Sequence, residues 1–438
     1  MAGAGPEDRV QTTPLLDSLK ILYVSQYFPP EMGAPAARVS ELSDRWAAAG
    51  HQVTVLTGFP NHPTGVVARG YRAKILRLVH REKMGDVNVV RTWLLPLANR
   101  RAIERILNYT SFLLSACITG LFLKRPDVVI GTSPQLLVGL AGWWLGLVKR
   151  APFVLEIRDI WPDSIAASGV ASRESLMNRS IGSLSRFLYR ASRRVVVVTS
   201  AFKEELVSKW DVPTEKIDVV ENGVETDLFT PEGTARNGDD DLAGKFVISY
   251  IGTIGMAHGL EVVVEAASQL SETHRDILFM VVGEGAEKQR LIAEADKRNL
   301  QNLRFMPSIP RTEIPSQIRA SDVCLVLLKK APIFETVIPT KMLEFMSCGR
   351  PVILGVDGQA RRVLEEGEAG LFVEPESVPE LVRTVVRLYE DEPLRTTLGE
   401  NGRKYAEERL SRKATAADYL IVLESIVGGP RQSKLTAR

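Results

Sequence analysis

The sequence FETVIPTKMLEFMSCGRPVI, residues 334–353, predicts a loop, one short helix and a buried strand. Thr340 is the expected N-cap of the helix. Gly349 lies where a helix ends in a left-handed residue, and Pro351 after it prevents continuation. The stretch therefore predicts the loop, helix and strand of an alternating α/β domain.

Two charged residues of this helix are expected to face away from its apolar side. Met342, Phe345 and Met346 recur at helical spacing, so they predict the face that packs on a core. Lys341 and Glu344 are three residues apart and share the opposite face. A cation at a helix N-terminus suits a phosphate, and a carboxylate one turn further can accept hydrogen bonds from a diol such as a ribose. The alternative is a solvated lysine and a glutamate favoured by the helix dipole.

Length and composition describe a soluble protein of two domains. The chain has 438 residues, of which 45% are hydrophobic and 25% are charged. Cys117, Cys324 and Cys348 are too few and too scattered for a disulfide framework or a zinc site, so we expect a reducing, cytoplasmic location. Residues 1–18 lack the apolar run of a signal peptide and predict a disordered leader.

The two halves of the chain differ in charge. Residues 1–210 carry 27 Lys and Arg against 16 Asp and Glu, a net charge of +11, whereas residues 211–438 carry 28 against 37, a net charge of −9. A basic half beside an acidic half suggests that one domain meets an anionic surface or ligand. The basic half has no arginine-rich tract interleaved with aromatic residues, so we expect no nucleic-acid partner.

Apolar runs that alternate with helical segments predict a parallel sheet in the first half. The predicted strands are residues 19–28, 52–58, 87–93, 127–133, 152–159 and 193–200. Gly33 lies where the chain turns into the first helix, so a ligand could come close there. The full GxGxxG spacing is missing, which argues against a dinucleotide and a dehydrogenase.

Polar residues at strand ends are the candidates for chemistry in this half. Glu156, Arg158 and Asp159 end one predicted strand, and ligands bind beyond the carboxyl ends of strands in such sheets. An ion pair between neighbours, with a purely structural role, is the alternative. His62 lies in the long connection 59–81 and could point into a cleft or lie in a surface turn.

Two apolar helices, residues 107–123 and 136–148, have basic residues near their ends. Such helices suit a membrane interface, and the alternative is a buried core helix. In the second half, three ligand-type turns lie at the carboxyl ends of predicted strands: Gly252–Gly255, Gly283–Gly285 and Pro339–Lys341.

Seven segments, in this order, carry a resemblance to a known family: YFPPEMG…R, TGFPNHPTG, RDIWPDS, NGVETDLFTP, GTIGMAHGL, VGEG and PTKMLEFMSCGRPVI. The chain resembles the retaining nucleotide-sugar glycosyltransferases of family 4, and in particular the bacterial fucosamine transferase subgroup of O-antigen and capsule synthesis. The resemblance extends from about residue 19 to about residue 427. It implies a GT-B fold, in which two Rossmann-like, doubly wound parallel-sheet domains face each other across a cleft.

With the resemblance, the expected organisation of the chain is a leader (1–18), an acceptor-binding domain (19–221), a linker (222–243), a nucleotide-sugar-binding domain (244–405), a helix that crosses back to the first domain (406–428) and a tail (429–438). The donor-binding residues that it implies are Gly33, Gly252, Thr253, Gly255, Gly283, Glu284, Ile309, Thr340, Lys341 and Glu344. Among them, Glu344 would take the ribose hydroxyls, Lys341 the diphosphate and Ile309 the base.

Several positions depart from the family pattern. The family has a second glutamate eight residues before Glu344; Glu335, one residue off, is the candidate. The Arg and Lys that usually follow the first glycine turn are missing, so Lys341 and His258 are expected to supply the positive charge. Arg158 stands where the family has a histidine, followed by the usual Asp159, and His62 is the candidate substitute for that histidine. The predicted catalytic residues are thus Asp159, Glu335, Lys341 and His258, and the predicted acceptor-binding residues are His62, Arg158 and Asp159.

The expected activity is retaining transfer of a sugar, such as an N-acetylated amino-deoxy sugar, from a nucleotide-sugar, with UDP favoured, to a lipid-linked or oligosaccharide acceptor. No cofactor or metal is expected. A polyprenyl-diphosphate-linked acceptor would account for the basic, apolar first half and for a peripheral position on the inner face of the plasma membrane. Two alternatives remain open: a GT-B nucleotide-sugar epimerase and a non-catalytic nucleotide-sugar-binding protein.

Overall fold

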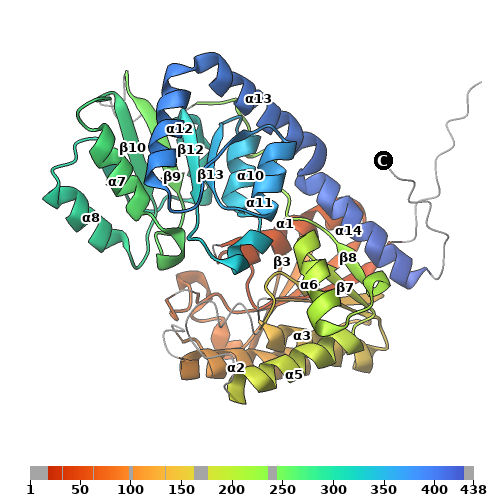
Figure 1. Ribbon diagram of the computed structural model, residues 1–438. Helices are drawn as coiled ribbons and strands as arrows, with labels where there is room; N and C mark the ends of the chain where they lie inside the picture. Colours follow the sequence, from red (N-terminus) through yellow and green to blue (C-terminus); the bar gives the residue numbers. More distant parts are fainter. Residues whose placement is uncertain are drawn as a thin grey trace, which may run out of the picture.

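The structure is a computed structural model that describes residues 18–31, 33–62, 64–97, 102–133, 135–161, 176–234 and 244–428. The predicted leader, apart from Ser18, lies outside these residues, as do the predicted tail and residues 235–243 of the predicted linker. The described residues form two lobes, each built on one sheet (Figure 1).

The first lobe contains an eight-stranded sheet in the order β3-β4-β2-β1-β5-β6-β7-β8. Its strands are β1 (Lys20–Val24), β2 (Gln52–Gly58), β3 (Val79–Met84), β4 (Val87–Thr92), β5 (Val128–Thr132), β6 (Phe153–Ile157), β7 (Arg194–Val197) and β8 (Ile217–Val219). Its α-helices are α1 (Ala34–Ala48), α2 (Ala102–Leu121), α3 (Leu136–Lys149), α5 (Leu176–Ala191) and α6 (Ser200–Trp210). All neighbouring strands are parallel except β3 and β4.

The second lobe contains a fully parallel six-stranded sheet in the order β11-β10-β9-β12-β13-β14. Its strands are β9 (Phe246–Ile251), β10 (Ile277–Val282), β11 (Leu303–Met306), β12 (Val323–Leu327), β13 (Val352–Gly355) and β14 (Gly370–Phe372). Its α-helices are α7 (Glu261–Leu270), α8 (Lys288–Lys297), α9 (Ile314–Arg319), α10 (Thr340–Ser347), α11 (Gln359–Glu366) and α12 (Val378–Glu390). The strand order reverses between β9 and β12, and ligands bind outside the carboxyl ends of strands at such a reversal.

The central strands are apolar along their whole length because both faces of each sheet are covered. In β9, Ile248 and Tyr250 belong to one hydrophobic core, and Val247 and Ile251 belong to the core on the opposite face. All six residues of β9 are buried. This burial on two faces is what a doubly wound parallel sheet requires, so the predicted fold of two such domains is confirmed.

Two features of the first lobe differ from the expectation. The predicted connection 59–81 contains the start of β3, which pairs with β4 in antiparallel register. β3 lies at the edge of the sheet, where one neighbour suffices, and its sequence VHREKM lacks the apolar run that predicts a central strand. Helix α2 begins at Ala102, five residues before the predicted start.

Among the described helices, none combines the length and the apolar character that crossing a membrane requires.

The chain returns to the first lobe through two C-terminal helices, α13 (Glu392–Arg409) and α14 (Arg412–Val427) (Figure 1). α13 packs on α10, whereas α14 packs on α1. The Trp46 indole donates a hydrogen bond to the Ala416 carbonyl at 3.0 Å, and its ring meets that of Tyr419 edge-on at 5.3 Å. The two lobes are therefore joined twice, by the segment after β8 and by the passage from α13 to α14.

Arg38 of α1 fixes the segment that leaves the first lobe. Its Nε donates to Glu156 Oε1 at 2.9 Å, and its other nitrogens donate to the Val220 carbonyl and the Asn222 side chain at 3.1 and 2.9 Å. Tyr23 also donates to Glu156, at 2.6 Å. Burial alone would raise the pKa of Glu156, but Arg38 holds it below the ordinary value. The geometry therefore supports a structural role for Glu156, as one partner of a buried ion pair.

Arg38→Met is expected to lower the free energy of unfolding by about 3–5 kcal/mol, because it leaves the Glu156 carboxylate buried without its cation. Urea denaturation followed by tryptophan fluorescence measures the change. Lys83→Met, which removes an exposed cation paired with Asp86, serves as the matched control and should leave the midpoint unchanged. A loss below about 1 kcal/mol for Arg38→Met would show that the pair is not needed.

Candidate functional site

A cavity of about 830 Å³ lies between the two lobes. The first lobe and α14 contribute Pro29, Pro30, Glu31, Gly33, Ala37, Arg38, Ser40, Glu41, His62, Arg158, Asn222 and Arg412. The second lobe contributes Ile251, Gly252, Thr253, His258, Val282, Gly283, Glu284, Ser308, Ile309, Arg311, Ile314, Thr340, Lys341 and Glu344. All the predicted donor-binding residues except Gly255 line this one cavity. Their roles toward a ligand remain proposals.

Helix α10 presents its charged face to the cavity. Its N-cap is Pro339, so the prediction that Thr340 caps the helix is wrong: Thr340 is the first helical residue and makes no capping bond. Met342 and Phe345 are fully buried in the core, as predicted, and Gly349 ends the helix with φ +66°. The opposite face therefore brings Lys341 and Glu344 to the cavity.

Lys341 is a half-buried lysine in the wall of the cavity. Its Nζ donates to the Tyr250 hydroxyl at 2.8 Å and lies 3.9 Å from the centroid of that ring. Burial lowers the pKa of Lys341 to about 7, although Glu344 raises it. A lysine with this pKa is charged in only about half of the molecules at neutral pH, and a bound anion would stabilise the charged form.

Two glycine bends pack closely beside this lysine. A Cβ on Gly252 would lie 2.8 Å from Lys341 Nζ, and a Cβ on Gly283 would lie 1.9 Å from the Gly252 carbonyl oxygen. Both glycines have positive φ, +146° and +151°. Their amides already donate to the Val282 and Met306 carbonyls, at 2.9 and 3.2 Å. The glycines are therefore needed for close approach of the backbone, whereas the N–H groups of these two residues are engaged elsewhere.

His258 lies at the end of the first glycine turn. Its Nδ1 is 3.3 Å from the Gly255 carbonyl, which can only accept, so the neutral ring carries its proton on Nδ1. Burial, and then the Lys341 charge, lower the pKa of His258 to about 4. The imidazole is thus neutral at pH 7, with Nε2 unprotonated. Of these two residues, Lys341 rather than His258 can therefore carry positive charge at pH 7.

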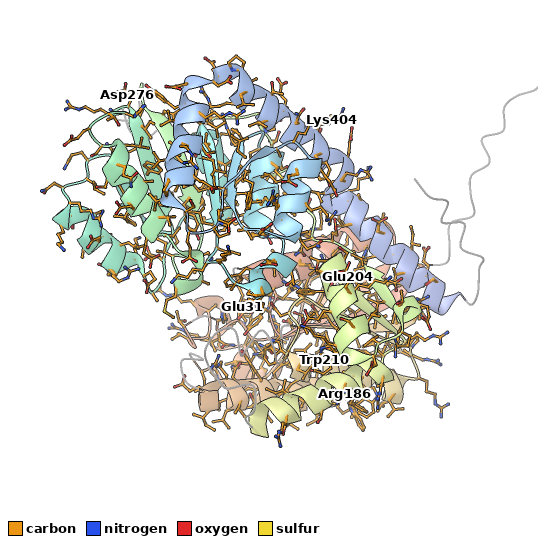
Figure 2. All side chains as sticks on the ribbon, viewed as in Figure 1. Glu31, Arg186, Glu204, Trp210, Asp276 and Lys404 are labelled. Carbon is orange, nitrogen blue, oxygen red and sulfur yellow. The ribbon has the colours of Figure 1, made fainter. Side chains whose placement is uncertain are left out.

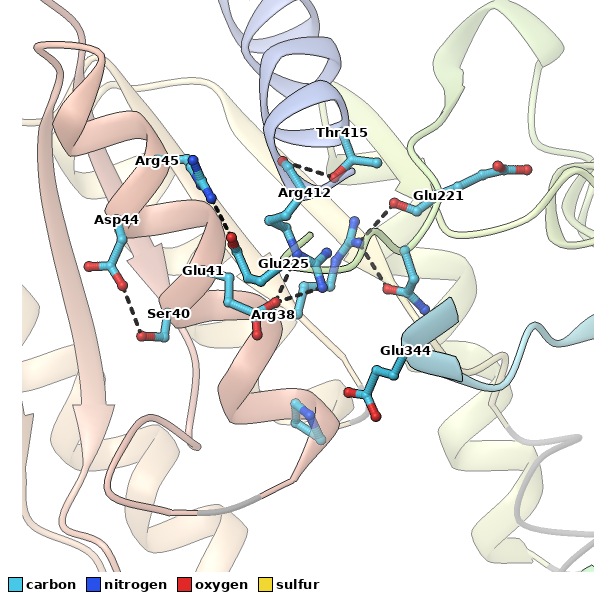
Figure 3. Close-up of polar contacts among 12 residues, drawn as sticks. Arg38, Ser40, Glu41, Asp44, Arg45, Glu221, Glu225, Glu344, Arg412 and Thr415 are labelled. Carbon is cyan, nitrogen blue, oxygen red and sulfur yellow. Dashed lines mark hydrogen bonds and ion pairs between the residues drawn. The ribbon is translucent and has the colours of Figure 1, made fainter. Parts of the chain in front are cut away.

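Glu344 belongs to a charge network that sequence reasoning missed. Arg311 Nη1 donates to Glu344 Oε1 at 3.0 Å, and Arg311 Nη2 donates to Glu41 Oε1 of α1 at 2.9 Å. Arg412 Nε donates to Glu41 Oε2 at 2.8 Å. Burial raises the pKa of Glu344, and Arg311 opposes that shift. Figure 3 shows Glu41 and Glu344 on facing elements, with Arg412 bonded to Glu41.

On the first lobe, Glu31 holds the loop that carries His62. The Glu31 carboxylate is 8% exposed and accepts hydrogen bonds from the backbone N–H groups of Asn61 and His62, both at 2.9 Å. Burial raises the pKa of Glu31 to about 7. Figure 2 labels Glu31 where the first lobe faces the second. Glu31 belongs to the segment YFPPEMG, but that segment does not predict its contact with a loop 30 residues away.

Three predicted catalytic or acceptor-binding residues lie at different places relative to the cavity. Arg158 lines the cavity and donates to the Pro35 carbonyl at 3.4 Å. Asp159 lines a small neighbouring recess with Ser133 and Trp161, and burial raises its pKa to about 6. Glu335 is exposed and lines a separate hollow on the second lobe. The structure therefore brings Arg158 to the donor cavity, Asp159 next to it and Glu335 away from it.

Comparisons with known proteins agree with this geometry. The model of the glycosyl transferase 4-like domain matches residues 33–223, and the model of glycosyl transferases group 1 matches residues 237–405. The putative colanic acid biosynthesis glycosyl transferase WcaI of Escherichia coli is 27% identical over 418 residues, which span 92% of this chain and 99% of that protein.

Solved structures share the fold at low identity. Sucrose-phosphate synthase from Thermosynechococcus elongatus has a TM-score of 0.72 at 20% identity and covers 93% of this chain and 99% of its own. HepE of Anabaena, in complex with UDP-glucose, has a TM-score of 0.67 at 16% identity and covers 93% of this chain and 100% of its own. These structures share the fold, and the two family models together identify the chain as a glycosyltransferase, an enzyme that transfers glycosyl groups. The chain is a GT-B glycosyltransferase of the family 4 type.

Gly283→Ala is expected to destabilise the second lobe and to displace the Gly252 bend, because the added methyl would lie 1.9 Å from a backbone oxygen. A strained backbone position of this kind costs about 1–3 kcal/mol, which thermal unfolding should detect. Gly70→Ala is the matched control: its Cβ would meet nothing within 4 Å. Equal melting temperatures for the two variants would contradict the described packing of the bends.

Proposed function

We propose that this enzyme is a retaining glycosyltransferase that uses a nucleotide-sugar, with UDP as the favoured nucleotide. One observation carries the proposal: the half-buried Lys341 ammonium lies beside the Gly252 bend at the strand-order reversal of the second sheet. A diphosphate is an anion that fits the charge of Lys341, and the cavity between the lobes has room for it. Support for UDP comes from HepE of Anabaena, whose structures hold UDP and UDP-glucose.

The proposed donor site follows the geometry of the second lobe. Glu344 accepts the hydroxyls of the ribose, and Ile309 lies where the base would stack or bond. Thr253, Glu284 and Thr340 surround the diphosphate and the sugar, whereas Gly255, which does not line the cavity, shapes the turn behind them. A bound diphosphate raises the pKa of Lys341 and of His258, so that the charged lysine, and with it a protonated His258, stabilise the leaving group. Because these groups carry the charge, the transfer is proposed to need no metal.

The proposed transfer step needs no nucleophile from the enzyme. The acceptor hydroxyl oxygen bonds to the anomeric carbon from the face of the leaving group, while the bond from that carbon to the diphosphate oxygen breaks. The hydroxyl proton moves to a diphosphate oxygen, and the anomeric configuration is retained. Arg158, Asp159 and His62 are proposed to orient the acceptor from the first lobe, and Glu335 contributes only if its loop moves toward the cavity.

Lys341→Met is expected to weaken binding of the nucleotide about 10- to 100-fold, because it removes a charge-assisted hydrogen bond worth about 1.5–3 kcal/mol. Glu344→Gln should weaken it about tenfold through the ribose. Thermal-shift titrations measure the nucleotide affinity of both variants. The titrations use UDP, GDP and dTDP and the corresponding nucleotide-sugars, so they also identify the preferred base. Lys297→Met, an exposed lysine of α8, is the control. A donor that binds and is isomerised without an acceptor would instead indicate an epimerase.

The acceptor is proposed to be a sugar on a polyprenyl diphosphate, in the synthesis of a surface polysaccharide such as O-antigen or capsule. The relative in colanic acid biosynthesis supports this assignment. The proposed subgroup is that of the fucosamine transferases, and an N-acetylated amino-deoxy sugar is the proposed donor sugar. Such an acceptor places the enzyme on the inner face of the plasma membrane.

The first lobe has a surface that suits an anionic membrane. Large apolar side chains are exposed in one stripe along α2 and at the adjoining end of α3: Leu107, Leu114, Ile118, Leu121, Phe122, Trp144, Leu147 and Val148. Lys149 joins the two helices by donating to the Leu121 and Leu123 carbonyls, at 2.7 and 2.6 Å. Lys124, Arg125 and Arg150 lie at the same end. Apolar side chains flanked by cations are typical of interfacial helices.

Ile118→Glu is expected to lower the fraction of protein that floats with phosphatidylglycerol vesicles at least about tenfold, since burial of such a side chain contributes about 1.5–3 kcal/mol. Ile421→Glu on α14 is a close control, because Ile118 and Ile421 are both 60% exposed. Flotation at low salt measures the difference. Equal flotation of the two variants, or no flotation of the unaltered protein, would contradict the membrane proposal.

A further inference from the structure

We propose that Arg311 couples closure of the interlobe cleft to the orientation of Glu344. One guanidinium bonds two carboxylates that belong to different lobes, Glu344 at 3.0 Å and Glu41 at 2.9 Å. The inference rests on the proposed function, because it takes Glu344 as the ligand of the ribose. It adds a positioning residue that no sequence motif singled out.

The network around Arg311 is compact and balanced in charge. Glu41 accepts from Arg311 through Oε1 and from Arg412 through Oε2. The Glu344, Glu41 and Arg412 side chains are 9, 14 and 3% exposed, so they are shielded from solvent. Two carboxylates and two guanidiniums therefore neutralise one another at the junction of the lobes. A partly buried network of this kind contributes more than an isolated surface pair.

The two bonds of Glu41 respond differently to motion of the lobes. Glu41 lies on α1, and Arg412 begins α14, which packs on α1 through Trp46 and Ala416. The Glu41–Arg412 pair therefore stays intact when the lobes separate. Arg311 belongs to the second lobe, in the 3₁₀ turn Arg311–Glu313. Separation of the lobes consequently breaks the Arg311–Glu41 bond and leaves Glu41 with Arg412.

Arg311 also touches the segment that joins the lobes. Its guanidinium carbon lies 5.2 Å from the centroid of the Phe229 ring, which is fully buried. Nearby, the joining segment pairs with the α13–α14 passage: Val224 N donates to the Leu410 carbonyl, and Arg412 N donates to the Val224 carbonyl, both at 2.8 Å. Arg311 is thus held between the joining segment, the first lobe and the ribose carboxylate.

The consequence for the donor follows from this geometry. In the closed cleft both arms of the guanidinium are fixed, so Arg311 fixes Glu344 Oε1 and leaves the other carboxylate oxygen for a diol. In an open cleft Arg311 loses its anchor on Glu41, and the orientation of Glu344 relaxes. Closure and ribose binding therefore favour each other. A lysine carries the same charge but has no planar fork with which to bond both carboxylates.

The test varies Arg311 and leaves Glu41 unchanged, because removal of Glu41 would strand the buried Arg412. Arg311→Gln and Arg311→Lys are compared with Arg383→Gln, an exposed arginine of α12. Energy transfer between dyes on Glu204→Cys (α6) and Lys297→Cys (α8), in a Cys117→Ser background, reports the separation of the lobes. Calorimetry with UDP, GDP and dTDP gives the nucleotide affinity, and steady-state kinetics separate KM from kcat.

We expect both Arg311 variants to widen the nucleotide-free cleft, and Arg383→Gln to leave it unchanged. Arg311→Gln should raise the dissociation constant of the nucleotide that binds about tenfold, and Arg311→Lys by less, since its charge remains near Glu344. If the distance between the dyes is unchanged in Arg311→Gln, the Arg311–Glu41 bond does not hold the lobes together. If the nucleotide affinity is unchanged, Arg311 does not orient Glu344. Failure of the unaltered protein to bind any of the three nucleotides would instead refute the donor assignment. The dye measurement would still show whether the Arg311–Glu41 bond holds the lobes together.

Discussion

The desolvated charge of Lys341 is the constraint on which the rest of the site depends. An ammonium group taken out of water is costly unless an anion or a set of acceptors replaces the lost hydration. Here Tyr250 provides a hydroxyl and a ring face, and the pKa falls to about 7. The site therefore suits an anion, and the free energy of binding that anion includes relief of the desolvation cost.

The fold brings the surrounding groups to this cation without any unusual element. The strand order of the second sheet reverses between β9 and β12, which opens a crevice at the carboxyl ends of the strands. Gly252 and Gly283 then allow two bends to pack within reach of Lys341, where any side chain would collide. The first lobe closes the cavity from the other side with Gly33, Glu31 and Arg158. In the proposed function, the second lobe supplies the charge that binds a diphosphate, and the first lobe covers it.

Local patterns predicted most of the fold and the second-lobe part of the site. Helical spacing placed Lys341 and Glu344 on one face of α10, and apolar runs predicted the central strands. Contacts between distant segments were not predictable in this way. Glu41 and Arg311 are 270 residues apart, and neither belongs to a pattern that names a partner. The edge strand β3 was missed because a polar sequence at a sheet edge resembles a loop.

The most direct test of the role of Lys341 is the number of protons taken up when a nucleotide binds. Calorimetry at pH 8, in buffers of different ionisation enthalpy, would be run with whichever of UDP, GDP and dTDP binds. The free lysine, with its pKa near 7, is mostly neutral at pH 8, so charging it on binding predicts uptake of about one proton per nucleotide. The share of the uptake that belongs to Lys341 should fall to about half at pH 7 and nearly vanish at pH 5, because the free lysine is then already charged. At pH 8 the Lys341→Met variant should take up about one proton fewer than the unaltered protein, with His258 accounting for any remainder. Tight binding at pH 8 with no proton uptake would contradict the account.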